Sequence, residues 1–226
     1  MSSNQPLNSM SASRFVRRWL AASPERASEL EKLAGLSLAT VDFDQLLQQQ
    51  RMKVPSLPAA MRRLRNLLMA ALIQRDLCGA GNLDEVLTVI SGFAEFVVRT
   101  HQDALHAELC ALHGMPVGAE SGEPQELIVI GMGKLGGREL NVSSDIDLIY
   151  VYDQEGETAG LENGRGRLSN HEYFAKAVRQ TVAWSGSPTD VPVTGLTADN
   201  AYSIRWAGFI RPCRAGDTYT FYTLPK

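Results

Sequence analysis

The sequence predicts an α+β fold in which a helical N-terminal lobe precedes a small mixed sheet. Apolar residues recur at helical spacing over residues 14–113, which indicates a group of amphipathic helices. Beyond them, residues 127–130 are apolar throughout, as expected of a short strand covered on both faces. Residues 146–152 supply a partner strand, and a glycine-rich turn stands between the two strands.

Capping signals divide the helical lobe into separate helices. Ser23 followed by a proline is typical of a helix start, and a second helix is predicted after Asp42. Asn82, with a glutamate three residues later, resembles a capping box and begins the last helix of the lobe. The apolar stripes are interpreted as core packing, and the stripe of the longest central helix comprises Met61, Leu64, Leu68, Ala71 and Leu72.

Bulk properties exclude several classes of protein. The 226 residues are 44% hydrophobic and 21% charged, which is ordinary for a soluble globular protein. The net charge of −3 provides no basic field for nucleic acid, so no nucleic-acid partner is expected. No apolar run approaches the ~20 residues of a membrane span, and residues 1–13 lack the apolar core of a signal peptide. The sequence therefore predicts a cytoplasmic protein without a membrane partner.

The cysteines and histidines show no ligand pattern. Cys78, Cys110 and Cys213 are far apart and odd in number, which fits reduced thiols better than a metal site or a disulfide framework. His101 and His106 are five residues apart, which is poor spacing for one helix face. The histidines are therefore interpreted as ordinary surface or core residues.

Composition shifts divide the chain into five predicted segments. Residues 1–13 are expected to be disordered, and residues 14–113 form the helical lobe. Residues 114–125 are rich in glycine and proline and are interpreted as a linker. Residues 126–183 form the core that contains the carboxylate-bearing strand, and residues 184–226 are an atypical C-terminal segment.

Within the second half of the chain, the pattern weakens towards the end. Residues 153–168 are predicted to be a loop, and a helix follows from residue 171 to about residue 182. After residue 183 no clear period emerges, although residues 191–193 and 202–206 are candidate strands. This abrupt change supports the hypothesis that the C-terminal segment is frameshifted or poorly folded.

Two carboxylates open the second predicted strand. Asp145 and Asp147 are two residues apart, so in a strand they share one face, with Cα atoms ~6.6 Å apart. Neighbouring carboxylates repel each other unless a cation lies between them, and oxygen-only ligands suit Mg²⁺, with Mn²⁺ as the alternative. Such ions stabilise the attacking and leaving oxygens in phosphoryl transfer. Asp145 and Asp147 are therefore the predicted metal ligands and catalytic residues.

The glycine-rich turn before these carboxylates is the predicted phosphate-binding element. Glycines allow backbone N–H groups to approach phosphate oxygens because no Cβ obstructs them. Two cations in the turn add positive charge, and two serines just before the first carboxylate offer hydroxyl groups to phosphate or cap the turn. The residues concerned are Gly131, Gly133, Lys134, Gly136, Gly137, Arg138, Ser143 and Ser144.

Simpler interpretations exist for each part of this pattern. An Asp-x-Asp pair is often a pair of solvated edge residues, and a glycine turn is often only a turn. Residues 131–136 also fit the loose dinucleotide-binding pattern G-x-G-x-x-G. That pattern requires a crossover helix after the glycines, and the seven residues between Gly137 and Asp145 are too few for one.

Taken whole, residues 131–150 (GMGKLGGRELNVSSDIDLIY) resemble the signature of the glutamine synthetase adenylyltransferase family. The helical segments around Met61 and Asn82 resemble the family's helical prelude, so the resemblance covers residues 14–182. The family comprises bifunctional bacterial enzymes that adenylylate and deadenylylate glutamine synthetase. The resemblance implies a partial polymerase-β-type nucleotidyltransferase domain, the first and deadenylylating one of two.

The resemblance also implies a reaction and a set of partners. Inorganic phosphate would attack the adenylyl-tyrosine of glutamine synthetase and release ADP, with Asp145 and Asp147 holding the metal ions. The turn at Gly136 and Gly137 and the serine pair would contact the phosphates of the bound nucleotide, ADP or ATP. The implied protein partners are glutamine synthetase and a PII signalling protein, which links the family to the regulation of nitrogen metabolism.

One departure from the family pattern bears on activity. The family completes its metal-binding trio with an aspartate in a Val-Asp-Met-Arg-Leu-Arg-Pro-like segment, and Asp190 and Asp199 do not lie in that context here. Low or absent turnover is therefore expected for this chain. The alternatives are an inactive remnant that binds nucleotide or a partner, and a nucleotidyltransferase for another acceptor such as an antibiotic or RNA. The long family-like run and the absence of basic character disfavour the latter.

Overall fold

The computed structural model describes residues 13–184, 194–195, 201–206 and 222–223. The predicted strand at residues 191–193 and nearly all of the predicted disordered N-terminus lie outside these residues. The chain divides into two compact units. The first comprises the chain up to Phe93 together with residues 140–142, and the second comprises residues 94–139 and the chain from Ser143 onward.

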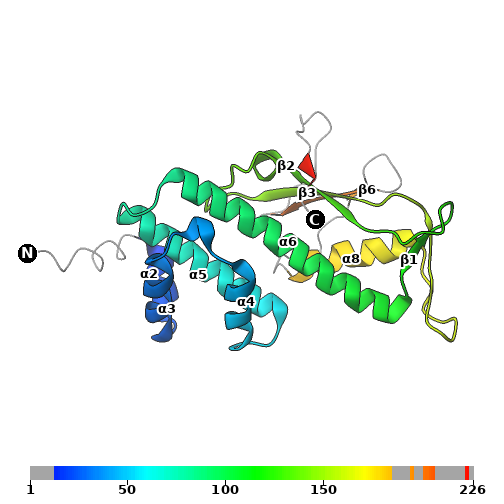
Figure 1. The fold of residues 1–226 in the computed structure, drawn as a ribbon, viewed down its shortest axis with the longest axis horizontal. Helices are drawn as coiled ribbons and strands as arrows, with labels where there is room; N and C mark the ends of the chain where they lie inside the picture. Colours follow the sequence, from blue (N-terminus) through cyan, green and yellow to red (C-terminus); the bar gives the residue numbers. More distant parts are fainter. Residues whose placement is uncertain (1–12, 185–193, 196–200, 207–221, 224–226) are drawn as a thin grey trace, which may run out of the picture. The chain divides into compact units, whose positions relative to one another are not determined.

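The first unit is helical, and α5 (Leu57–Leu77) is its central element (Figure 1). Its predicted apolar stripe is confirmed, because Met61, Leu64 and the later members are all buried, whereas Arg62 is exposed. The helices α2, α3 and α4 all pack against α5. The other elements of this unit are α2 (Arg14–Ala21), α3 (Glu25–Ala34), η1 (Leu38–Thr40), α4 (Phe43–Arg51) and the first part of α6 (Leu83–His113).

Side-chain caps form at two of the predicted helix starts, Asp42 and Asn82, whereas the predicted cap at Ser23 is wrong because Pro24 is the N-cap of α3 and no side chain caps it. The Asp42 carboxylate accepts a hydrogen bond from the Gln45 N–H at 3.1 Å, which caps α4. Asn82 Oδ1 accepts from the Glu85 N–H at 2.8 Å at the start of α6. Only this half of the predicted capping box is formed, because the Glu85 carboxylate accepts instead from the Leu38 N–H at 2.8 Å.

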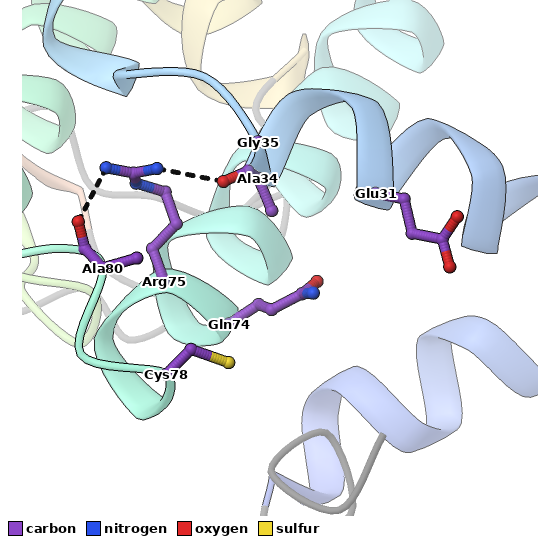
Figure 2. Close-up of a pocket in the computed structure, with 7 residues that line it drawn as sticks. All are labelled: Glu31, Ala34, Gly35, Gln74, Arg75, Cys78 and Ala80. Atoms are coloured by element: carbon purple, nitrogen blue, oxygen red, sulfur yellow. Dashed lines mark hydrogen bonds between the residues drawn. The ribbon is translucent and has the colours of Figure 1, made fainter. Parts of the chain in front are cut away.

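A buried arginine joins three helices of this unit. Arg75 Nε donates to Glu85 Oε2 at 2.9 Å, and both side chains are largely buried. The other guanidinium nitrogens of Arg75 donate to the carbonyls of Ala34 (3.0 Å) and Ala80 (2.9 Å), as Figure 2 shows. The two carbonyls lie at the end of α3 and in the turn before α6, so one planar side chain holds both chain reversals against α5.

The second unit contains an antiparallel sheet with the strand order β5-β6-β3-β2-β7. The strands β2 and β3 pair with each other, and β3 pairs on its other side with β6, so β6 confirms the predicted strand at residues 202–206 (Figure 1). Every ladder formed by the described strands is antiparallel, whereas the sequence predicted a mixed sheet. The strands are β2 (Ile128–Met132), β3 (Ile146–Val151), β5 (Thr194–Gly195), β6 (Ala201–Trp206) and β7 (Tyr222–Thr223). The α+β class is confirmed.

A small two-stranded sheet forms where the sequence predicted only loops. The strands β1 (Pro116–Gly118) and β4 (Gly156–Thr158) pair antiparallel. At Gly156 the two backbones approach so closely that a Cβ would lie 2.0 Å from the Val117 carbonyl oxygen, which explains a glycine there. The helix α8 (Asn170–Trp184) begins against this sheet, because the buried Asn170 Nδ2 donates to Val117 O at 3.0 Å.

The predicted apolar face of α8 is confirmed by its buried residues. Tyr173, Phe174 and Val178 are all buried, and the Phe174 ring stacks on Tyr152 with ring centroids 4.8 Å apart. Tyr150 of β3 is also fully buried, and burial raises the pKa of its hydroxyl. Within the part of the chain that the structure covers, no helix has the length and apolarity that crossing a membrane requires.

The Arg75 network generates a test of stability. Arg75→Ala removes the cation of a largely buried ion pair, so the Glu85 carboxylate loses its ion-pair partner. This change should lower the free energy of unfolding by about 3 kcal/mol. Urea denaturation monitored by circular dichroism measures this change. Arg62→Ala, an exposed position on the same helix, is the control and should change it by less than about 0.5 kcal/mol. Equal losses in the two variants would contradict the role of Arg75.

Candidate metal and phosphate site

The two predicted carboxylates lie at the start of β3. Asp145 immediately precedes the strand and is exposed, and Asp147 is its second residue and is partly buried. Successive side chains of a strand alternate between its faces, so Asp147 lies on the face opposite to that of the buried Leu148 and Tyr150. Ile149, on the same face as Asp147, is also buried, so Asp147 lies at the partly exposed start of a strand that is buried further along.

The glycine turn and Asp147 are brought together by the pairing of β2 with β3. In this ladder, Met132 lies opposite Asp147. The chain then turns into the short helix α7 (Gly133–Gly136), and Gly133 adopts a φ of 52°. A Cβ at Gly133 would lie 4.0 Å from Asp147 Oδ2, so the carboxylate lies beside the first residue of the turn. The two halves of the predicted site are therefore adjacent.

The glycines of the turn differ in what they contribute. Gly133 has a left-handed conformation that residues with a Cβ adopt only with strain. Gly137 has an ordinary φ of −81°, and its N–H donates to the Gly133 carbonyl at 3.0 Å. The Gly137 amide is therefore used inside the turn, whereas the sequence suggested that it would contact phosphate. Gly131 and Gly136 are buried.

The predicted polar residues of the turn lie on the accessible side of the site. Lys134 is an exposed residue of α7. Ser143 is exposed and Ser144 is partly buried, and both lie in the segment that leads into Asp145. Lys134 and Ser143 therefore present an ammonium group and a hydroxyl group to solvent.

Arg138 has a partner that the sequence analysis did not identify. Its φ is 56°, and its Nη1 lies 3.2 Å from Glu95 Oε1. Glu95 belongs to α6 and is buried, with a side chain 9% exposed, whereas the Arg138 side chain is 55% exposed. The signal was present in the sequence, because a glutamate between Phe93 and Phe96 interrupts an apolar helix face.

The donor set around β3 limits the kind of metal ion that would fit. Two carboxylates of one strand face supply oxygen ligands only, and Mg²⁺ accepts one or two carboxylates together with water and phosphate oxygens. Among the residues for which side chains are described, no group of three or more His, Cys, Asp and Glu is placed to hold a metal ion. On β6, the residue in register with Asp147 is Arg205.

The dinucleotide-binding alternative is excluded by the topology. That fold connects two parallel strands through a crossover helix. Here β2 and β3 are antiparallel neighbours, and the helix between them, α7, is a single turn. The glycines of residues 131–136 therefore belong to the end of β2 and the short helix α7 that follows it.

Two cavities among the described residues of the first unit lie beside Arg75. One of about 200 Å³ is bounded by Gln74, Cys78 and Arg75, with Glu31 at its edge (Figure 2). Another, of about 340 Å³, lies on the other side of Arg75, against Asp84 and residues beside it. The guanidinium between them is already bonded to two carbonyls and a carboxylate, so these spaces are interpreted as gaps in helix packing.

Comparison with known proteins shows the family of the chain. Residues 4–190 match the model of the glutamate-ammonia ligase adenylyltransferase family, and the chain therefore belongs to that family. The family is one of nucleotidyltransferases, and the match contains the glycine turn, both carboxylates and α8.

Relatives in three bacteria carry the same name, bifunctional glutamine synthetase adenylyltransferase/adenylyl-removing enzyme. The protein of Ralstonia nicotianae is 49% identical over 179 residues, which cover 77% of this chain and 18% of the relative. For Chromobacterium violaceum the identity is 45% over 172 residues, covering 76% and 19%. For Burkholderia pseudomallei it is 42% over 188 residues, covering 80% and 20%. The chain spans about a fifth of the length of these relatives.

The different conformations of two glycines provide a test of the turn. Gly133→Ala places a Cβ at positive φ and should lower the free energy of unfolding by about 1 to 2 kcal/mol. Gly137→Ala is the matched control, because its φ is ordinary and its Cβ would approach only the Glu139 side chain, at 3.4 Å. The control should change stability by less than about 0.5 kcal/mol in the same urea denaturation experiment. A control variant as unstable as Gly133→Ala would contradict the conformation assigned to the turn.

Proposed function

We propose that the second unit carries a nucleotidyl-transfer site of the deadenylylating kind, which removes adenylyl groups from glutamine synthetase by phosphorolysis. The observation that carries this proposal is the position of the Asp147 carboxylate beside Gly133, at the junction of β3 and the glycine turn. Family membership supports it, and the names of the relatives include an adenylyl-removing activity.

Magnesium is the proposed metal, with manganese as the alternative. Asp145 and Asp147 would hold it, because they offer carboxylate oxygens from one face of β3 and leave room for water and phosphate oxygens. When bound, such an ion neutralises negative charge on the phosphoryl group in transfer. The chain's own contribution is to fix the two carboxylates by a strand whose other face is buried.

In the proposed reaction, an oxygen of inorganic phosphate attacks the phosphorus of the adenylyl group. The bond between that phosphorus and the tyrosine oxygen breaks, the tyrosine oxygen regains a proton, and ADP leaves. Lys134 and Arg138 are proposed to stabilise the phosphate charges, and Arg138 keeps half of its side chain exposed while Glu95 holds it. The Gly136 turn and the hydroxyls of Ser143 and Ser144 are proposed to contact the nucleotide phosphates.

The proposed partners follow from this reaction. Glutamine synthetase is the protein substrate, inorganic phosphate is the attacking group, and ADP or ATP is the bound nucleotide. Regulation by a PII signalling protein and a cytoplasmic location are proposed with them. The net charge of −3 supports a protein partner over nucleic acid. The aligned part of the chain covers about a fifth of the relatives that bear this activity in their names.

A second candidate function is a nucleotide- or partner-binding module without turnover. The sequence favours it, because neither Asp190 nor Asp199 lies in the Val-Asp-Met-Arg-Leu-Arg-Pro-like context that supplies the family's third metal-binding carboxylate. Losing one metal ligand would remove much of the several kcal/mol that a metal ion contributes to phosphoryl transfer. Such a module would still bind ADP through the turn and the remaining carboxylates.

Phosphorolysis tests the first proposal directly. The chain is incubated with adenylylated glutamine synthetase, inorganic phosphate and Mg²⁺, and ADP release is measured. Replacing both carboxylates, Asp145→Asn with Asp147→Asn, should lower the rate by about a hundredfold or more. Asp153→Asn, an exposed position beyond the other end of β3, is the control and should leave the rate unchanged.

The same experiment separates the two candidates. An unmodified chain that releases no ADP, but binds ADP in calorimetry, would overturn the catalytic proposal and favour the binding module. A double variant as active as the unmodified chain would contradict the assignment of the site to β3.

A further inference from the structure

A cluster of nucleophilic and titratable side chains lies in the second unit, separate from the carboxylates. His106 and Cys110 are four residues apart on α6 and therefore lie on the same face of that helix. Cys110 Sγ is 3.5 Å from His106 Nε2. Tyr173, from α8, brings its hydroxyl to 3.2 Å from Cys110 Sγ and to 3.1 Å from His106 Nδ1. Three groups that exchange protons are thus in mutual contact.

These distances allow a closed set of hydrogen bonds. In the tautomer that carries its proton on Nδ1, His106 donates to the Tyr173 oxygen, and the Tyr173 hydroxyl donates to Cys110 Sγ. The Cys110 thiol then donates to His106 Nε2. Each group can donate one proton and accept one, and the Tyr173 hydroxyl also lies 3.3 Å from the His106 carbonyl oxygen, its second possible acceptor. A base and a hydroxyl donor therefore both contact the same sulfur.

The surroundings of Tyr173 keep its hydroxyl a donor. The residue is 1% exposed, and burial raises the pKa of its hydroxyl, with a further increase from the hydrogen bond and the charge of Cys110. The tyrosine therefore retains its proton at neutral pH and can stabilise a negative sulfur. A nucleophile beside a base that a third group orients is the arrangement that activates cysteines in proteins.

Cys110 is also within reach of small reagents. The residue is partly exposed, whereas Tyr173 behind it is buried. A second sulfur, Met115 Sδ, lies 3.9 Å from Cys110 Sγ, and Met115 is 39% exposed. The side of the cluster that carries the two sulfurs therefore has access to solvent.

We infer that Cys110 is a modification site that reacts with hydroperoxides, activated by His106 and Tyr173. The thiol proton passes to His106 Nε2, and the sulfur attacks one oxygen of hydrogen peroxide. A sulfur–oxygen bond forms while the oxygen–oxygen bond breaks, and the departing hydroxide takes the proton from His106 to become water. The sulfur is oxidised by two electrons to a sulfenic acid, and the peroxide is reduced. This inference does not depend on the proposed nucleotidyl transfer.

Competitive trapping on the intact chain tests the inference. The chain is treated with a limiting amount of hydrogen peroxide in the presence of dimedone, and peptide mass spectrometry compares labelling of Cys110 with that of Cys78. Cys78 is the internal reference because it is the more exposed of the two. Activation by the cluster should make Cys110 react about tenfold faster than Cys78 despite its lower exposure.

Two variants then separate activation from exposure. His106→Gln and Tyr173→Phe should each lower the labelling rate of Cys110 several-fold without changing that of Cys78, and Tyr173→Phe preserves the ring that packs edge-on against Phe174. Labelling of Cys110 that is equal to or slower than that of Cys78 in the unmodified chain would overturn the inference, whether or not the variants fold. Faster labelling that neither variant changes would overturn the assigned roles of His106 and Tyr173.

Discussion

The pairing of β2 with β3 is the interaction on which the site depends. Its register puts Met132 opposite Asp147, so the chain leaves β2 and enters the glycine turn next to that carboxylate. A slip by one residue would rotate Asp147 to the other face of the strand and Leu148 out of the core. Because Leu148, Tyr150 and Tyr152 are almost fully buried, such a slip would be costly, and core packing thereby holds the carboxylate in place.

The connection between the turn and β3 is held at two further points, each within its own unit. In the second unit, Arg138 is paired with the buried Glu95 of α6. In the first unit, the Leu140 N–H donates to the buried Ser91 hydroxyl at 3.3 Å. The segment between α7 and β3 is thus bonded to α6 at Arg138 and at Leu140.

Much of this arrangement was predictable because it rests on local rules. The helical stripe at Leu64 follows from the period of 3.6 residues, and the cap at Asp42 follows from the preference of aspartate for helix starts. The family resemblance, confirmed by the family match over residues 4–190, identified the chain as a member of a nucleotidyltransferase family. A rule of this type needs only neighbours in the sequence.

The features that escaped prediction depend on contacts between distant residues. The strands β1 and β4 are about forty residues apart in sequence and are joined by the close approach at Gly156, which composition alone presents as a loop. The burial of Glu95 on an apolar helix face depends on its ion pair with Arg138, which the sequence pattern alone does not reveal. Likewise, the helical spacing of His106 and Cys110 is visible in the sequence. The contact of His106 with Tyr173, 67 residues further along the chain, is not.

Metal binding is the central claim, and it can be measured without any turnover. Mn²⁺ is added to the chain, and electron paramagnetic resonance measures the concentration of free hydrated Mn²⁺, whose signal is lost when the ion binds. The account predicts binding that Asp147→Asn weakens by at least about tenfold and that Asp153→Asn leaves unchanged. Binding that is unaffected by Asp147→Asn would contradict the assignment of β3 as the metal-binding strand, even if the chain releases ADP.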